Sequence, residues 1–173
     1  PLYQKYCEII LDGSKTIEDR KSLLKSCYKI IFNSNWSKKR FLNGLENKFV
    51  NSDKLVVFFQ SAKKNQNSIL KSKKKWITFV GKLNSAKGYD VFAKSIKKIL
   101  RKFPNWKAKI IGDEKREKIM LNHKNADILG FLNHNKVLNI FKQTSIAVAC
   151  SRWEEPFGRT SLEASANGCA VII

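Results

Sequence analysis

The sequence predicts an α/β fold in which a Rossmann-like parallel sheet is covered by helices on both faces. Short apolar runs alternate with segments of helical periodicity over residues 76–173, and a glycine follows several of these runs. Repeated strand–helix units with short connections favour a parallel sheet, because each helix returns the chain to the edge where the next strand starts. In such sheets, ligands bind beyond the carboxyl ends of the strands.

The first part of the chain, residues 1–59, predicts a small unit of strands and helices. In order, we expect the end of a helix at 22–28, a strand at 29–32, a basic helix at 38–45 and a strand at 54–59. The helix at 38–45 has candidate N-cap residues in Asn33–Ser37. Residues 60–75 are polar, rich in lysine and without periodicity, so we expect them to form an interdomain linker.

Residues 76–173 alternate between strand and helix patterns. We expect strands at 76–80, 107–111, 126–129, 146–150 and 170–173, and helices at 90–103, 114–122, 136–143 and 158–167. The helix at 90–103 has the clearest apolar stripe, with lysines on its other face. The loops after the first four strands should share one rim, because parallel strands end at the same edge of a sheet. These loops begin at Gly81, Gly112, Gly130 and Ser151.

The chain is strongly basic, with a net charge of +20 at pH 7 that is spread along its whole length. Such charge attracts nucleic acid, anionic lipid headgroups and phosphorylated substrates. Lys, Asn and Ile are all abundant, so part of the charge reflects a bias in composition. The sequence contains no nucleic-acid reader motif, and we therefore expect no nucleic-acid partner.

The cysteines and histidines do not predict a metal site. Cys7, Cys27, Cys150 and Cys169 form no Cys-x-x-Cys pair, and the two histidines add no metal-ligand spacing. We expect no metal and no cofactor, and buried free thiols in a reducing compartment. No apolar run approaches the ~20 residues of a membrane span, and the first residues do not form a signal peptide. Because the chain begins without Met and ends in an apolar run, we expect a segment of a longer protein.

The most informative segment is Glu155-Pro-Phe-Gly-Arg-Thr-Ser-Leu-Glu163, which lies between an apolar run and a run of small residues. The pattern predicts a buried strand, a loop with one acid and a helix that opens near Gly158. The N–H groups and the dipole of a helix start favour a phosphate, and carboxylates accept hydrogen bonds from sugar hydroxyls. Taken alone, the two acids are better explained by helix electrostatics, because Arg159 and Glu163 form an i,i+4 pair.

The first rim loop, Gly81-Lys-Leu-Asn-Ser-Ala-Lys-Gly88, contains two lysines that can clamp a diphosphate, Lys82 and Lys87. Gly81 allows the backbone to approach a ligand closely. The loop is neither a Walker loop nor a Gly-x-Gly-x-x-Gly fingerprint, because its order of Gly and Lys differs. A solvated turn before a helix explains this loop equally well when it is taken alone.

Five segments follow one another in a recognisable order: Val80-Gly-Lys-Leu, Ala86-Lys-Gly88, Ile111-Gly-Asp113, Leu129-Gly-Phe131 and Glu155-Pro-Phe-Gly-x-x-x-x-Glu163. In this order and spacing they resemble the retaining GT-B glycosyltransferases of group 1, the GT4-like family. The resemblance covers residues 76–173 and extends to 22–59 through Phe32-Asn-Ser-x-x-Ser37-Lys. It implies that 76–173 is a nucleotide-sugar-binding domain, incomplete at its C-terminus, and that 1–59 is the C-terminal part of the GT-B N-terminal domain.

The resemblance also implies a site for a nucleotide-sugar donor. The implied donor-binding residues are Gly81, Lys82, Lys87, Glu155, Phe157, Gly158, Arg159, Thr160 and Glu163, of which Lys82, Lys87 and Glu155 are the implied catalytic residues. The two lysines would neutralise the diphosphate of the leaving group, and backbone N–H groups within 157–160 would contact the phosphate. Glu155 would hold hydroxyls of the donor sugar, and Glu163 would accept hydrogen bonds from the ribose hydroxyls.

The chain departs from the family pattern in several places. It has Lys82 where the family usually has Arg, Ala170 where Pro usually precedes the final strand, and Gln60-Ser61-Ala62 where many members have Asn-Gly. Replacement of Arg by Lys keeps the charge but loses the bidentate fork. The first half of the acceptor-binding domain is absent from the sequence, so we expect the isolated chain to be inactive.

The function we expect is transfer of a hexose-type sugar, with retention, to a saccharide or lipid-linked acceptor at the cytoplasmic face of the cell membrane. The expected peripheral position on an anionic membrane surface rests on the basic composition and on what the resemblance to the family implies. Two alternatives stay open. One is a non-catalytic nucleotide-binding domain with a GT-B-like fold, and the other is a basic nucleic-acid-binding domain whose affinity falls steeply with salt.

Overall fold

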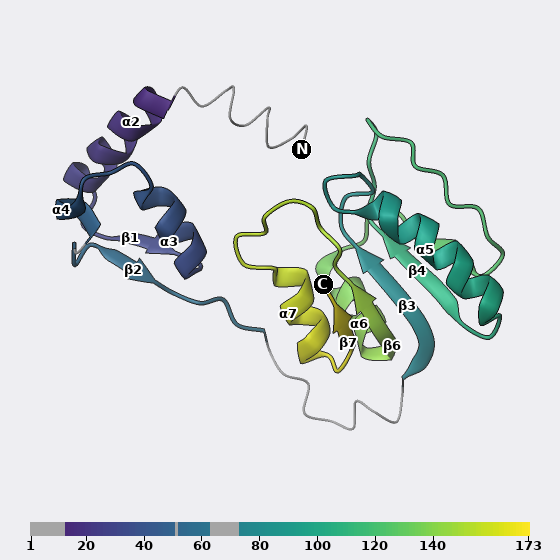
Figure 1. The fold of residues 1–173 in the computed structure, drawn as a ribbon. Helices are drawn as coiled ribbons and strands as arrows, with labels where there is room; N and C mark the ends of the chain where they lie inside the picture. The colour runs from purple at the N-terminus through teal and green to yellow at the C-terminus, as the bar shows by residue number, and fades with distance from the viewer. Residues whose placement is uncertain (1–12, 51, 63–72) are drawn as a thin grey trace. The chain divides into compact units, whose positions relative to one another are not determined.

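The computed structural model describes residues 13–50, 52–62 and 73–173, and it divides the chain into two compact units (Figure 1). The first unit contains Pro1–Gln60 and Glu155–Phe157, and the second contains Ser61–Glu154 and Gly158–Ile173. Most of the expected linker, residues 63–72, lies outside the described residues, as does Cys7. The expected linker is too long at its end, because Lys74 and Lys75 already belong to a strand.

Among its described residues, the first unit combines three helices with a two-stranded parallel sheet. Its elements are α2 (Gly13–Ser26), β1 (Ile30–Phe32), α3 (Asn35–Leu42), α4 (Asn47–Val50) and β2 (Leu55–Val57). The two predicted strands are confirmed with shorter bounds. The predicted basic helix is present but begins and ends three residues earlier than expected. The Ser34 hydroxyl sets the early start by accepting a hydrogen bond from the Ser37 backbone N–H (3.0 Å). Leu24, Phe32 and Leu55 form the small core of this unit.

The second unit contains a five-stranded parallel sheet with the order β5-β4-β3-β6-β7. Its elements are β3 (Lys74–Val80), α5 (Tyr89–Lys102), β4 (Lys107–Ile111), β5 (Ala126–Ile128), α6 (His134–Gln143), β6 (Thr144–Val148), α7 (Arg159–Ala166) and β7 (Ala170–Ile172). Each of these elements was predicted, and the predicted ends lie within two residues of the observed ones. The predicted Rossmann-like α/β fold is therefore confirmed for this unit.

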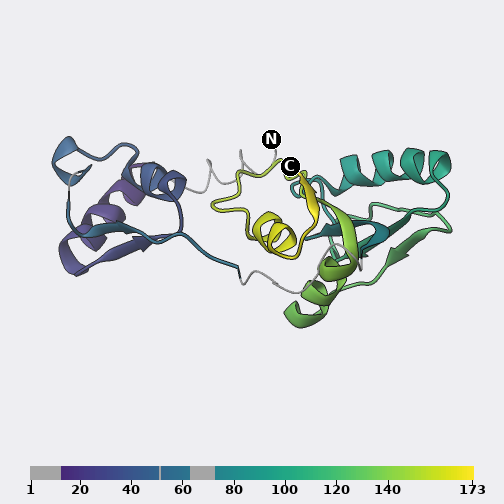
Figure 2. The ribbon, with the colours of Figure 1, turned by 90° about the horizontal axis from the view of Figure 1, so that it is seen from below.

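Helices cover both faces of the second sheet because successive side chains of each strand point to opposite faces. On β3, Ile77 and Phe79 pack against α5, together with apolar residues of β4. On the other face, Val80 packs against a core that includes Phe141 of α6 and Ala164 of α7. Figure 2 shows α5 on one side of the sheet and α6 on the other.

Residues 114–122 form no helix, so that prediction from the sequence was wrong. The Glu114 carboxylate accepts hydrogen bonds from the backbone N–H and the Nε–H of Arg116, both 3.0 Å long. Such local bonds to the backbone compete with helix formation. Ile119 and Leu121 both pack against the core beside α5, which suits an extended segment whose alternate side chains face the same way.

Two further expectations concern thiols and membrane spans. Cys27, Cys150 and Cys169 are free thiols; Cys169 is buried, whereas Cys27 and Cys150 are half-buried. Burial raises the pKa of the Cys150 and Cys169 thiols, which keeps them in the less reactive protonated form. None of the helices in the described parts of the chain has the length and apolarity that a membrane span requires.

Candidate functional site

The strand order of the second unit creates a switch point between β3 and β6. From β3 the chain runs outward to β4 and β5, and it then returns to β6 on the other side of β3. The loops that follow β3 and β6 therefore leave the sheet side by side at its carboxyl edge, where open α/β sheets bind ligands. The loop of residues 81–88, which follows β3, is called the basic loop below.

The predicted rim of four loops is confirmed by backbone hydrogen bonds. The Gly81 N–H donates to the Ile111 carbonyl (3.0 Å), and the Gly112 N–H donates to the Gly130 carbonyl (2.8 Å). On the other side of the switch point, the Arg152 N–H donates to the Ala86 carbonyl in the basic loop (2.9 Å). The loops after β3, β4, β5 and β6 therefore form one continuous edge.

Two glycines allow these loops to touch through their backbones. Gly88 has a φ of +70°, and a Cβ atom there would overlap the carbonyl oxygen of Cys150. The Cys150 thiol in turn donates to the Gly88 carbonyl, with 3.2 Å between Sγ and O. At Gly112, a Cβ atom would overlap the carbonyl oxygen of Gly81. The sequence therefore requires glycine where the basic loop meets its neighbours on either side.

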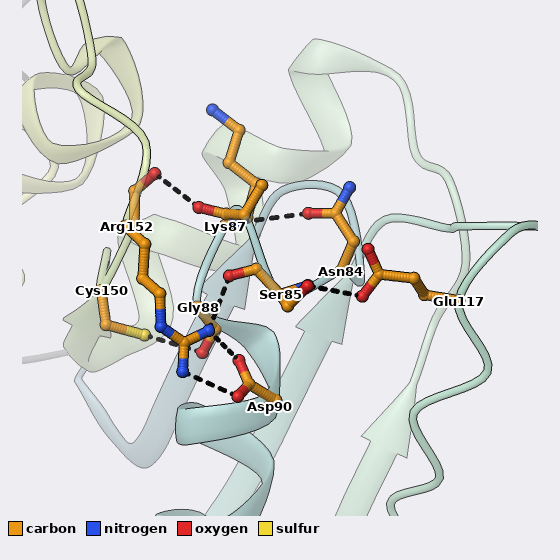
Figure 3. Close-up of polar contacts among 10 residues, drawn as sticks. Asn84, Ser85, Lys87, Gly88, Asp90, Glu117, Cys150 and Arg152 are labelled. Atoms are coloured by element: carbon orange, nitrogen blue, oxygen red, sulfur yellow. Dashed lines mark hydrogen bonds and ion pairs between the residues drawn. The ribbon is translucent and has the colours of Figure 1, made fainter. Parts of the chain in front are cut away.

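Arg152 fastens the basic loop to the loop after β6 (Figure 3). Its Nη1 and Nη2 donate to the two carboxylate oxygens of Asp90 at 2.6 and 2.8 Å, and Nη1 also donates to the Ser85 carbonyl at 2.8 Å. The Arg152 guanidinium lowers the pKa of the Asp90 carboxyl by hydrogen bonding to it. Asp90 lies in the first turn of α5, so one side chain joins three segments of the edge.

The opposite side of the basic loop is held by two glutamates that follow β4. Glu117 Oε2 accepts from the backbone N–H and the hydroxyl of Ser85, both at 2.8 Å. Glu114 Oε2 accepts from the Asn84 amide at 3.0 Å. Asn84 Oδ1 in turn accepts from the Lys87 N–H at 3.1 Å (Figure 3). Hydrogen bonds, chiefly from Arg116, lower the pKa of Glu114 to about 2, so the carboxylate is ionised. These acids hold the loop in one conformation.

The basic loop places two positive charges at the switch point. Lys82 is exposed and Lys87 is half-buried. In Figure 3 the Lys87 side chain extends away from the Arg152–Asp90 pair, whose charges compensate each other. The loop is therefore fixed by its backbone, Asn84 and Ser85, while its lysines contribute charge that can attract an anion.

The other predicted residues lie in the loop after β6 and in α7. Glu155 is exposed and Phe157 is half-buried, and both belong to the first compact unit. Gly158 is the N-cap of α7 and makes no side-chain hydrogen bond to the helix, so its first N–H groups have no side-chain acceptor from the cap. Arg159 is exposed and Thr160 is half-buried in the first turn of α7.

Glu163 lies in the second turn of α7 with only 12% of its side chain exposed. Its Oε1 accepts from Arg159 Nε at 2.7 Å, which is the i,i+4 pair expected from the sequence. The same oxygen contacts His134 Nε2 at 3.0 Å. His134 was missed from the sequence because it lies 29 residues away, at the first position of α6. No group of three His, Cys, Asp or Glu side chains suited to a metal ion occurs in residues 13–50, 52–62 and 73–173.

Residues 60–173, which include the whole rim, match the protein family of glycosyl transferases group 1. The chain belongs to this family. An uncharacterised glycosyltransferase from Haemophilus influenzae is 26% identical to this group 1 chain over 111 residues, which are 62% of this chain and 31% of that protein.

Solved structures show the same GT-B fold. HepE of Anabaena, in complex with UDP and glucose, is similar with a TM-score of 0.65 and 16% identity, over 92% of this chain and 48% of HepE. The pneumococcal O-GlcNAc transferase GtfA, in complex with UDP and GlcNAc, has a TM-score of 0.62 and 16% identity, over 82% of this chain and 29% of GtfA. This group 1 chain thus spans less than half the length of these relatives.

Proposed function

We propose that the protein is a retaining GT4-type glycosyltransferase that transfers a hexose-type sugar from a nucleotide-sugar donor to a lipid-linked or polysaccharide acceptor. Membership of the group 1 family supports the class of reaction. HepE and GtfA have the same fold and bind UDP, which makes UDP the first nucleotide to test. In this proposal, residues 76–173 hold the donor.

The basic loop carries the proposal. A nucleoside diphosphate leaves with additional negative charge when the sugar bond breaks, and fixed cations at that point lower the barrier. Lys82 and Lys87 supply such charge at the switch point. The start of α7, beyond the Gly158 N-cap, offers backbone N–H groups of Arg159 and Thr160 to a phosphate oxygen. Charge of this kind stabilises the leaving group without a metal ion in the proposed mechanism.

In the proposal, the two glutamates accept hydrogen bonds from hydroxyl groups of the donor. We assign the exposed Glu155 to the donor sugar, and the backbone of Phe157 to the phosphate. We assign Glu163 to the ribose, because its carboxylate is largely buried and held by two donors. Carboxylates accept hydrogen bonds from hydroxyls with either oxygen, which suits a diol such as ribose.

The proposal extends to the location of the enzyme and to the role of residues 1–59. We place the enzyme at the cytoplasmic face of the cell membrane, where a basic surface favours anionic lipid. The parallel pairing of β1 with β2 is compatible with the tail of a GT-B N-terminal domain over residues 1–59. If the acceptor site lies in the remainder of that domain, the 173-residue chain alone binds donor but shows no transfer.

Calorimetric titration with UDP, GDP and ADP, and with a short DNA duplex, tests the donor site. We expect one nucleoside diphosphate to bind, and Lys82→Ala and Lys87→Ala each to weaken it about tenfold, as loss of one charge-assisted hydrogen bond predicts. Lys94→Ala and Lys98→Ala are matched controls, because both lysines are exposed on α5 away from the basic loop. Binding of DNA but of no nucleoside diphosphate would refute the proposal.

A further inference from the structure

His134 and Glu163 connect the first turn of α6 to the second turn of α7, and these two helices follow different strands. The two side chains meet at 3.0 Å between Nε2 and Oε1. We propose that His134 is a positioning residue that holds the Glu163 carboxylate for the ribose hydroxyls of the donor, and so favours ribonucleotides over nucleotides that lack those hydroxyls. This inference rests on the proposed function, because it concerns the same donor site.

The backbone that carries His134 is fixed relative to α7. Asn133 caps α6 by accepting a hydrogen bond from the Lys136 N–H at 3.0 Å, which sets the start of the helix at His134. Further along α6, Phe141 is fully buried in the same core as Ala164, the residue next to Glu163. The two helices therefore share one rigid core, and the distance between the imidazole and the carboxylate is set by packing.

The two hydrogen-bond donors to Glu163, Arg159 and His134, differ in how strongly they constrain the position of its carboxylate. Arg159 lies on the same helix and is 67% exposed, so its long side chain is solvated and constrains the carboxylate weakly. His134 reaches the carboxylate from another helix with a short, planar side chain. An imidazole bound to a carboxylate through Nε2 carries its hydrogen there, whether the ring is neutral or charged. Two donors from different directions restrict the rotamers of Glu163.

Both donors contact the same oxygen of Glu163. A carboxylate has about four lone-pair positions on two oxygens, so Oε2 retains its capacity to accept a hydroxyl group. A carboxylate that is ordered before the ligand arrives loses less conformational freedom on binding. The resulting gain in affinity occurs only with ligands whose hydroxyls reach Glu163. The proposal can therefore be tested by comparing ligands with and without those hydroxyls.

The comparison is made by titrating UDP and 2′,3′-dideoxy-UDP, which lacks both ribose hydroxyls, into the wild-type protein and three variants. We expect His134→Ala to weaken UDP binding roughly three- to tenfold, which lies in the lower part of the range of coupling between contacting side chains, and to leave dideoxy-UDP unchanged. His134→Gln should restore most of the UDP affinity, because its amide can donate to the carboxylate. Asn135→Ala, at the next position of the same turn, is the matched control and should bind both ligands as the wild type does.

The other outcomes contradict either the role of His134 or the proposed function. Equal weakening of both ligands in His134→Ala, or equal affinity of wild type and His134→Ala for UDP, would overturn the positioning role alone. A wild type that binds neither UDP nor its dideoxy analogue, nor GDP or ADP, would overturn the proposed function itself. Thermal unfolding followed by circular dichroism establishes that each variant is folded before it is titrated.

Discussion

Arg152 and Asp90 form a bidentate ion pair across 62 residues of sequence, with N–O distances of 2.6 and 2.8 Å. The pair lies where the loop after β6 meets the first turn of α5. Because Arg152 also donates to the Ser85 carbonyl, the pair fixes one side of the basic loop. The position of the proposed phosphate-binding lysines therefore depends on a residue that need not touch the donor.

Arg152→Lys should separate this role from simple charge. Lysine keeps the positive charge but cannot form two parallel hydrogen bonds to Asp90 while also reaching Ser85. We expect UDP to bind a few-fold more weakly, measured by calorimetry, because the basic loop becomes less ordered. Arg101→Lys, on the exposed face of α5, makes the same chemical change outside the site and should leave the affinity unaltered. If Arg152→Lys also bound UDP with unaltered affinity, the basic loop would keep its conformation without the bidentate pair.

Glu114 should make the stability of the second unit depend on pH. Its pKa falls from 4.5 in the unfolded chain to about 2 in the folded one, mainly through hydrogen bonds from Arg116. The unfolded state thus binds the proton first as the pH falls, so the contribution to stability is complete above pH 4.5 and is lost toward pH 2.

Urea unfolding of wild type and Glu114→Gln between pH 7 and pH 2 tests this dependence. We expect the variant to be less stable at neutral pH, by an amount that is constant down to about pH 5 and disappears toward pH 2. Asp113→Asn, at the preceding and exposed residue, is the control and should show no such convergence. A difference between wild type and Glu114→Gln that persists unchanged at pH 2 would argue against ionisation as its origin.

Gly88→Ala should cost more stability than a positive φ alone explains. Gly88 and Gly130 have similar φ angles, +70° and +66°, but only at Gly88 would a Cβ atom meet another backbone, that of Cys150. We expect Gly130→Ala to lower the free energy of unfolding by about 1 kcal/mol, and Gly88→Ala by about 2–4 kcal/mol. Denaturant unfolding measures both losses. Equal losses would mean that the basic loop and the loop after β6 move apart at little cost in free energy.

The strands and helices of the second unit were predictable because their apolar residues follow a local period. Residues 89–102 are an example, since an apolar stripe of that length has only one good explanation. Residues 114–122 misled the prediction, because Glu114 and Glu117 suit a helix by composition but bind Asn84 and Ser85 across the edge. The helix propensity of a segment does not depend on partners that are distant in the sequence, so it could not predict these hydrogen bonds.

For the candidate site, the sequence indicates residues that lie close together in the chain but not residues that converge from distant segments. Lys82 and Lys87 lie in one loop that begins and ends with glycine, and this pattern is visible in the sequence. His134 carries no comparable signal, because its relation to Glu163 arises only when α6 and α7 pack on the same face of the sheet. The cap at Asn133, which sets the start of α6 at His134, was likewise not predicted from the sequence, where the helix was expected to begin at residue 136.

The exposed face of α5 should contribute to binding of anionic membranes. Lys94, Lys98 and Arg101 are all exposed on this helix, together with the apolar side chains of Val91 and Ile99. Each basic residue near an anionic surface contributes about 1 kcal/mol, so reversing the charge of all three should weaken binding at least tenfold. Co-sedimentation with phosphatidylglycerol vesicles measures the change, and phosphatidylcholine vesicles show the contribution of charge.

The control for this experiment reverses three other exposed lysines, Lys115, Lys118 and Lys124, which follow β4. It has the same net charge as the α5 variant. If both triple variants lose vesicle binding equally, the total charge of the protein causes the attraction and α5 has no special role.

Tyr89→Phe should leave the protein as stable as the wild type or more so. Tyr89 is fully buried, and among the residues that the structure describes its hydroxyl is the buried side-chain polar atom without a hydrogen-bond partner. Its ring packs against Phe79 and Phe92, with centroids 5.3 and 6.3 Å away, so phenylalanine can keep those contacts. Removing a buried hydroxyl that bonds to no protein group removes a desolvation cost, and we expect the free energy of unfolding, measured with denaturant, to rise by about 1 kcal/mol.

Tyr28→Phe, at a tyrosine that is 87% exposed, is the control and should leave the free energy of unfolding unchanged. A clear loss of stability in Tyr89→Phe would mean that the hydroxyl bonds to an ordered water molecule, and Tyr89 would then belong to the polar edge of the sheet rather than to its core.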